Sequence, residues 1–173
     1  MSIEEVSNII GKIADGLEER CISYMASHSD TIVTIISEQM IRGRGGDDEY
    51  LTPTYDDDPF FEEEGYWQGR YAAYKAWKQT IAVYPPNWLH FDPRPPEVPN
   101  LWIDGTFHGE IKAYRQDNSL FTDPGNGNGP AIVEKYENYH HDILNLGPRG
   151  IAYFNYEYLE PEIGRFFQEC GYK

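Results

Sequence analysis

The chain has 173 residues, of which 40% are hydrophobic and 25% charged, a composition typical of a folded globular protein and unlike a disordered chain or a coiled coil. Its 29 acidic and 14 basic residues give a formal net charge of −15, which excludes a nucleic-acid binder that relies on a basic surface and disfavours anionic membranes. One hydrophobic core suffices at this length, so we expect a single domain over residues 1–173.

The cellular context follows from what the sequence lacks. The N-terminus has no basic region of the kind that opens a secretory signal, and the longest apolar run, residues 32–36, is too short to span a bilayer. The two cysteines, Cys21 and Cys170, are separated by almost the whole chain, which fits a reducing compartment. We therefore expect a protein made in the cytoplasm that makes no contact with a membrane.

The N-terminal part of the chain predicts two helices. Residues 3 to about 26 have apolar side chains at three- and four-residue spacing, with a possible break near Gly16. Ser29 or Asp30 then caps a second helix over 31–41, whose β-branched residues would equally suit a strand, but residues 37–39 break the alternation of a strand. We expect the apolar stripe of the first helix to be buried against this subunit or a neighbour; it consists of Ile3, Val6, Ile10, Ile13 and Leu17.

Two long segments without periodicity flank a predicted helix over 66–81. Residues 43–65 carry nine acidic side chains, and residues 84–100 carry six prolines. Self-repelling charge and proline both suit an extended arm better than a buried core, so we expect arms that reach neighbouring subunits. The alternative is that their aromatic side chains fold back onto their own domain. The candidate anchors of a subunit interface are Phe60, Phe61, Tyr84, Trp88 and Phe91.

The C-terminal half predicts a β-hairpin and two further helices. Residues 110–115 alternate, a turn at Asp117-Asn118 follows, and residues 119–121 resume the strand. A short helix is expected over 131–138 and a terminal helix over 156–170. The expected fold class is α+β, with helices packed on a small antiparallel sheet and long extended loops or arms.

No catalytic, metal-binding or cofactor-binding constellation has a workable spacing. The acidic clusters 56–58 and 62–64 lack the ligand spacing of an EF-hand, and the adjacent His140 and His141 would point about 100° apart on a helix. A nucleophile elbow and a Walker loop are also missing from the sequence. We expect no enzyme. The alternative is a metal-dependent enzyme that uses the two histidines and the acidic clusters.

The order of short motifs resembles a viral family. Residues 37–43 (Ser-Glu-Gln-Met-Ile-Arg-Gly) close the helical region, and residues 100–111 (Asn-Leu-Trp-Ile-Asp-Gly-Thr-Phe-His-Gly-Glu-Ile) lead into the hairpin. Residues 131–136 (Ala-Ile-Val-Glu-Lys-Tyr) then precede residues 143–150 (Ile-Leu-Asn-Leu-Gly-Pro-Arg-Gly) and the last helix. This pattern is similar to the tailed-phage virion-morphogenesis family of tail-completion and head–tail joining proteins. The sequence departs from that family at 104–107, where Asp-Gly-Thr-Phe stands in place of Thr-Gly-x-Leu.

The resemblance implies a structural protein of the virion, assembled in the host cytoplasm. Such proteins form a homo-oligomeric ring in the neck, commonly six- or twelve-fold, between the portal and the tail, and they have no active site. Their partners are other neck, portal or tail proteins, and DNA passes through the ring; a channel lined with carboxylates lets it pass without binding. The alternative is a small acidic cytoplasmic protein that regulates or inhibits a basic partner.

Overall fold

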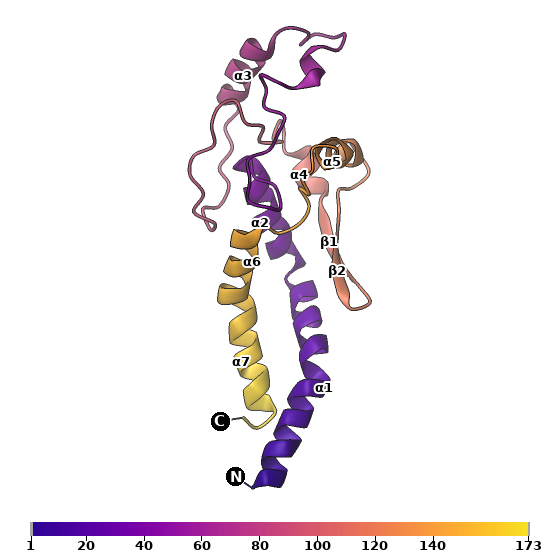
Figure 1. The fold of residues 1–173 in the computed structure, drawn as a ribbon, viewed down its shortest axis with the longest axis vertical. Coiled ribbons are helices and arrows are strands. Elements are labelled where there is room, and N and C mark those ends of the chain that lie inside the picture. The colour runs from indigo at the N-terminus through magenta and orange to yellow at the C-terminus, as the bar shows by residue number, and fades with distance from the viewer. Residues whose placement is uncertain (1, 173) are drawn as a thin grey trace.

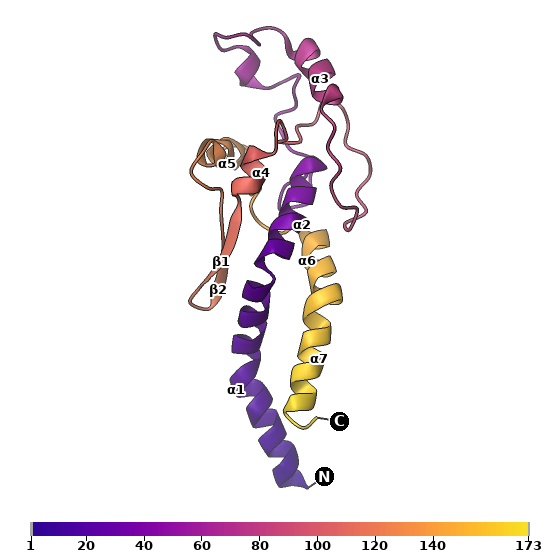
Figure 2. The same ribbon diagram turned by 180° about the vertical axis from the view of Figure 1, so that it is seen from behind.

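The protein is elongated, as a computed structural model that describes residues 2–172 shows. Helices α1 and α7 run side by side at the end that carries both termini, and α3 lies at the opposite end (Figure 1). The hairpin and α5 flank the middle of the molecule, and the view from behind gives the same arrangement (Figure 2). The helices are α1 (Ile3–Ser27), α2 (Ser29–Ile41), the 3-10 turn η1 (Pro59–Phe61), α3 (Tyr71–Thr80), α4 (Thr106–Glu110), α5 (Gly129–Glu137), α6 (Pro148–Phe154), the π-helical turn η2 (Asn155–Leu159) and α7 (Glu160–Glu169).

Helix α1 is unbroken and begins with a capping box. The backbone N–H of Glu5 donates to the Ser2 hydroxyl at 3.2 Å, and the Ser2 backbone N–H donates to the Glu5 carboxylate at 2.6 Å. The break considered near Gly16 is absent; the chain interrupts its helix at His28, where φ is −115°, and continues as α2. The helical interpretation of the second segment is confirmed.

The predicted hairpin is confirmed. Strand β1 (Lys112–Gln116) pairs antiparallel with β2 (Ser119–Asp123), in a register that places Tyr114 opposite Phe121. The turn falls at Asp117, which adopts a positive φ of 52°. Residues 106–110, which lie within the second motif, form the short helix α4, so the strand starts later than expected. With its helices and this small antiparallel sheet, the protein has the α+β fold that the sequence predicts.

The C-terminal helix is longer than expected. It begins at Pro148 rather than near residue 156, because α6, η2 and α7 follow one another without a gap. Proline at position 161 cannot donate to the carbonyl four residues earlier. The π-helical turn ends at Leu159, two residues before this proline, and such turns change the hydrogen-bond register within a helix.

The hydrophobic core surrounds α2 in the middle of the molecule. This helix contributes Ile32, Ile35, Ile36 and Met40, each at most 3% exposed. The remaining members come from loops, the α4–β1 region, α5 and α6; they are Leu51, Leu89, Phe91, Val98, Phe107, Ile111, Tyr136, Ile143, Leu144 and Phe154.

Two adjacent polar residues of α2 hold loops against this core. Glu38 is fully buried, and its two carboxylate oxygens accept backbone N–H bonds from Trp88 and Leu89, each at 3.1 Å. Gln39, also fully buried, accepts from the backbone N–H of Gly147 at 2.9 Å and donates to the carbonyl of Asn145 at 3.1 Å. Buried side chains thus satisfy backbone groups of irregular segments that have no sheet or helix partner.

The two segments predicted as arms belong in large part to this core. In residues 43–65 the side chains of Leu51, Tyr55 and Phe61 are at most 6% exposed, and in residues 84–100 those of Leu89 and Phe91 are equally buried. The expectation that neither segment suits burial in its own subunit is therefore wrong at these positions. The physical reason is that apolar side chains spaced among the acids and prolines pack inward, while the charged ones stay in water.

Candidate functional site

The five aromatic residues predicted as interface anchors have different environments. Phe61 and Phe91 are 6% exposed and lie in the chain's own core, so neither is free to anchor a neighbour. Trp88 is half-buried and stacks on Tyr153 of α6, with ring centroids 5.4 Å apart. The alternative that these aromatics fold back on their own domain holds for these three.

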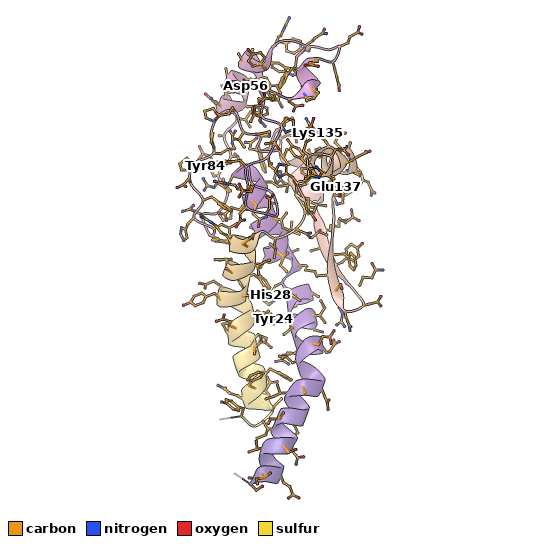
Figure 3. All side chains as sticks on the ribbon, viewed as in Figure 1. Tyr24, His28, Asp56, Tyr84, Lys135 and Glu137 are labelled. Carbon is orange, nitrogen blue, oxygen red and sulfur yellow. The ribbon has the colours of Figure 1, made fainter. Side chains whose placement is uncertain are left out.

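Two of the predicted anchors remain available. Tyr84 is 92% exposed and lies on the outside of the Pro-rich segment (Figure 3), and Phe60 is 43% exposed. Phe60 contacts Phe61 edge to face, with centroids 5.2 Å apart, so its ring is held in place while one side faces solvent. The structure does not bring Tyr84 and Phe60 into one cluster.

Phe91 is enclosed by two arginine side chains. The guanidinium of Arg44 lies 5.3 Å and that of Arg149 lies 4.8 Å from the centre of its ring. Arg149 also donates to the carbonyl of His90 at 3.0 Å. The Arg-Gly-Arg element at 42–44 and the Pro-Arg-Gly motif at 148–150 therefore help to hold the Pro-rich segment on the core.

A cavity of about 270 Å³ opens beside the cluster of aromatic rings near α3. Its wall includes the aliphatic side chains of Leu101 and Ile132 and the ion pair between Asp58 and Lys135, whose charged atoms are 2.6 Å apart. Figure 3 labels Lys135 on α5, so this ion pair links α5 to the acidic segment. The aromatic members of the wall are Tyr55, Phe60, Phe61, Tyr74 and Tyr136.

Two buried basic groups lie at the back of this region. Lys78 is 3% exposed and donates to the carbonyl of Trp102, and burial lowers its pKa to about 8. His108 is 7% exposed, its ring lies 5.1 Å from that of Trp102, and burial lowers its pKa to about 4. Lys78 lines the cavity, and the carboxylate on the cavity wall, that of Asp58, is bound to Lys135. The hydrogen bond of Lys78 therefore joins α3 to the loop at Trp102, and the ion pair of Lys135 joins α5 to the loop at Asp58.

The adjacent histidines point in different directions. His141 is buried, and its Nε2 atom accepts from the backbone N–H of Thr52 at 3.1 Å, which holds the acidic segment at its start. His140 is exposed and has a positive φ of 65°. Within residues 2–172, no three His, Cys, Asp or Glu side chains come together in a group that could hold a metal ion.

The acidic clusters are partly neutralised by lysines from elsewhere in the chain. Asp56 pairs with Lys75 of α3 at 2.5 Å, and the buried Asp58 pairs with Lys135 and accepts from the backbone N–H of Phe60 at 3.1 Å. The residues of the second cluster, 62–64, are exposed. The first cluster therefore supports local structure, while the second faces solvent.

Three exposed aliphatic side chains lie near the start of α1. Ile3 is 91%, Val6 39% and Ile10 60% exposed, and we call these three residues the N-terminal stripe. The chain just after α7 lies beside Ile9: a Cβ atom on Gly171 would be 3.5 Å from the Ile9 side chain. The first turns of α1 extend beyond the C-terminus in both views (Figures 1 and 2).

The expected stripe of α1 is thus divided between two environments. Ile9, Ile13 and Leu17 are half-buried, and Gly16 lets the ring of Phe166 approach to 2.9 Å of where a Cβ atom would lie. The N-terminal stripe lies on the same side of the helix but is left in water. Periodicity identified the apolar side of α1, but no local pattern indicates which part of that side α7 covers.

The comparisons with known proteins add no relative. No family model, no curated protein and no solved structure matches the chain. None of the helices within residues 2–172 is long and apolar enough to cross a membrane. The candidate site is therefore defined by its own chemistry: an exposed aliphatic stripe on the protruding end of an acidic helix.

Proposed function

We propose that this protein is a structural subunit of a tailed-phage virion that forms a ring in the neck, between portal and tail. The observation that carries the proposal is the N-terminal stripe, because three large aliphatic side chains on a protruding helix are costly in water unless another protein covers them. A structural subunit needs such a contact surface and no active site.

Two further features support this proposal. The resemblance to the virion-morphogenesis family implies a hairpin after residues 100–111 and a last helix after residues 143–150; this chain has a hairpin over 112–123, and its last helical segment begins at Pro148, within the second motif. The net charge of −15 suits a ring through which DNA passes, since a carboxylate-rich wall does not bind phosphates.

Co-expression with the portal protein of the same genome tests the proposal. The expected result is a co-purified assembly in which negative-stain micrographs reveal an additional ring of this chain on the portal. Light scattering of the chain alone supplies the reference mass.

A small acidic protein that binds a basic partner is the second candidate, and the same net charge favours it. That candidate requires a monomer that binds one copy of its partner. A one-to-one complex with a soluble basic protein, together with no binding to the portal, would replace the neck proposal.

A further inference from the structure

We propose that the cavity beside α3 binds a small aromatic carboxylate, with the ring of the ligand among the aromatic side chains of the wall and its carboxylate on the ammonium group of Lys78. This inference goes beyond the proposed function and does not depend on it. It follows from three observations: the volume and apolar wall of the cavity, the buried ammonium group, and the balance of charges on the wall.

The cavity has the size and the wall of a site for one aromatic ring. An apolar cavity of about 150 Å³ already holds a benzene ring. The volume of about 270 Å³ therefore leaves room for a short side chain as well. Tyr55, Phe61 and Tyr136 form the buried part of the wall, whereas Phe60 and Ile103 are exposed and give the cavity an entrance from solvent. Such a concave, largely apolar wall with few polar groups is typical of small-molecule sites.

Lys78 supplies a polar group with hydrogen-bonding capacity to spare. It lines the cavity, is buried, and donates to the carbonyl of Trp102. An ammonium group has three N–H donors, so this bond leaves two for a ligand. In the part of the chain that the structure describes, the lysines paired with carboxylates are Lys75 and Lys135, and Lys78 forms no ion pair.

The charge of Lys78 therefore lacks a counter-charge from the chain. Burial, together with the nearby charge of Arg94, lowers the pKa of Lys78 to about 8, so most of these amines are still protonated at pH 7. A buried charge without a partner is unfavourable, and a carboxylate ligand supplies the missing partner. Hydrogen bonds between two charged groups are also stronger than those between neutral ones.

The charges on the cavity wall favour an anion over a cation. The wall carries Lys78, Lys135 and one carboxylate, that of Asp58, which Lys135 already binds at 2.6 Å. One positive charge on the wall is thus left over. The acids Glu63 and Glu134 line a neighbouring depression and are not part of this wall. Aromatic rings alone would attract a cation, but the ammonium group of Lys78 repels it.

Three compounds with the same ring and chain length test the inference: 3-phenylpropanoate, 3-phenylpropanamide and 3-phenylpropylamine. Ligand-observed NMR titrations of the full chain at pH 7 measure their affinities. We expect the propanoate to bind in the millimolar range that suits a single-ring fragment, the amide about tenfold or more weakly, and the amine not at all. Equal affinities of the acid and the amide, or no binding of the acid at about 10 mM, would overturn the inference.

Lys78→Met removes the charge and keeps an apolar side chain of similar length. This variant should bind the propanoate about tenfold or more weakly than the unmodified protein does, and no better than it binds the amide. The matched control is Lys12→Met, the same substitution at an exposed lysine of α1 that does not line the cavity, and it should bind as the unmodified protein does. If Lys78 only held the carbonyl of Trp102, Lys78→Met would change stability and keep the preference for the acid, which would overturn the inference.

A second pair of variants leaves the buried lysine in place. Ile103 is exposed at the entrance of the cavity, so substitutions there should leave the fold intact, as circular dichroism verifies. Ile103→Glu should weaken binding of the propanoate by about threefold relative to Ile103→Gln, because it places a like charge near the site, and should leave binding of the amide unchanged. Equal affinities of these two variants for the propanoate would place its binding outside the cavity and overturn the inference.

Discussion

The carboxylate of Glu38 accepts a hydrogen bond of 3.1 Å from the backbone N–H of Leu89, 51 residues further along the chain. This bond anchors the Pro-rich segment to the last turn of α2, beside the hydrophobic core. A segment that the composition marks as extended and solvated is thereby built into the centre of the molecule.

The first prediction concerns the pH dependence that Glu38 creates. Burial raises the pKa of this carboxyl above its ordinary value of 4.5, so the folded state keeps its proton to a higher pH than the unfolded state does. The contribution of Glu38 to the free energy of unfolding therefore falls as pH rises from 4.5 through the raised folded pKa.

The variant Glu38→Gln has no group that titrates at this position. The free energy of unfolding of the unmodified protein should therefore change relative to that of the variant as pH rises from 4.5 through the raised pKa of Glu38. Urea unfolding at a series of pH values measures it. Curves that stay parallel at every pH would contradict the prediction.

The second prediction distinguishes core from arm in the Pro-rich segment. Phe91→Ala should lower the free energy of unfolding by about 3–5 kcal/mol, because the ring is buried between Arg44 and Arg149. Tyr84→Ala, at a side chain 92% exposed, should change it by less than about 0.5 kcal/mol. Denaturant unfolding measures both. An equally small change in the free energy of unfolding for both variants would mean that all of residues 84–100 is a free arm.

The third prediction tests the close packing of α6 on α2. A Cβ atom on Gly150 would lie 2.6 Å from the Gln39 side-chain oxygen and 2.9 Å from a methyl group of Ile35. Gly150→Ala should therefore cost about 1–3 kcal/mol through overpacking. Gly164→Ala on α7 is the matched control: nothing lies within 4 Å, so the better helix propensity of Ala should leave stability unchanged or raise it by up to about 1 kcal/mol. Thermal unfolding that ranks the two variants the other way round refutes this packing.

The fourth prediction compares two isoleucines on successive helices. Ile10→Ala should change the free energy of unfolding of the isolated chain by less than about 0.5 kcal/mol, because Ile10 is 60% exposed. Ile36→Ala, at a fully buried position of α2, should cost about 2–5 kcal/mol. A large effect of Ile10→Ala would place the N-terminal stripe in a core contact that the isolated chain makes by itself.

The fifth prediction compares two lysine–aspartate pairs. Lys135→Ala removes the partner of Asp58, whose side chain is 7% exposed, and should cost about 1–3 kcal/mol, because a buried carboxylate loses a charge-assisted bond. Lys75→Ala removes the partner of Asp56, whose side chain is 42% exposed, and should cost at most about 1 kcal/mol. Denaturant unfolding of both variants in one buffer measures the loss of free energy of unfolding. Similar losses for Lys135→Ala and Lys75→Ala would argue against a structural role for the Asp58 pair.

Local patterns were sufficient for several elements. The three- and four-residue spacing of α1, the apolar face of α2 and the Asp117-Asn118 turn depend on residues close together in the chain, and the structure confirms each of them. Such patterns act through backbone geometry, which any short stretch carries within itself. The α+β class could be predicted for the same reason.

Contacts between distant residues decided the parts of the fold that local patterns did not predict. The Pro-rich segment belongs to the core because Glu38 binds its backbone. Residues 148–155 form a helix that packs on α2 at Gly150. Periodicity along the chain reports neither contact.

The candidate site illustrates the same division. Residue spacing is enough to predict an apolar stripe on α1 from Ile3 to Leu17, on a chain of net charge −15. That Gly171 packs beside Ile9 while Ile3, Val6 and Ile10 stay in water is visible in the folded chain alone. The physical reason is that hydrophobic burial depends on the area that a neighbour removes from water, and that area is a property of two packed elements rather than of one.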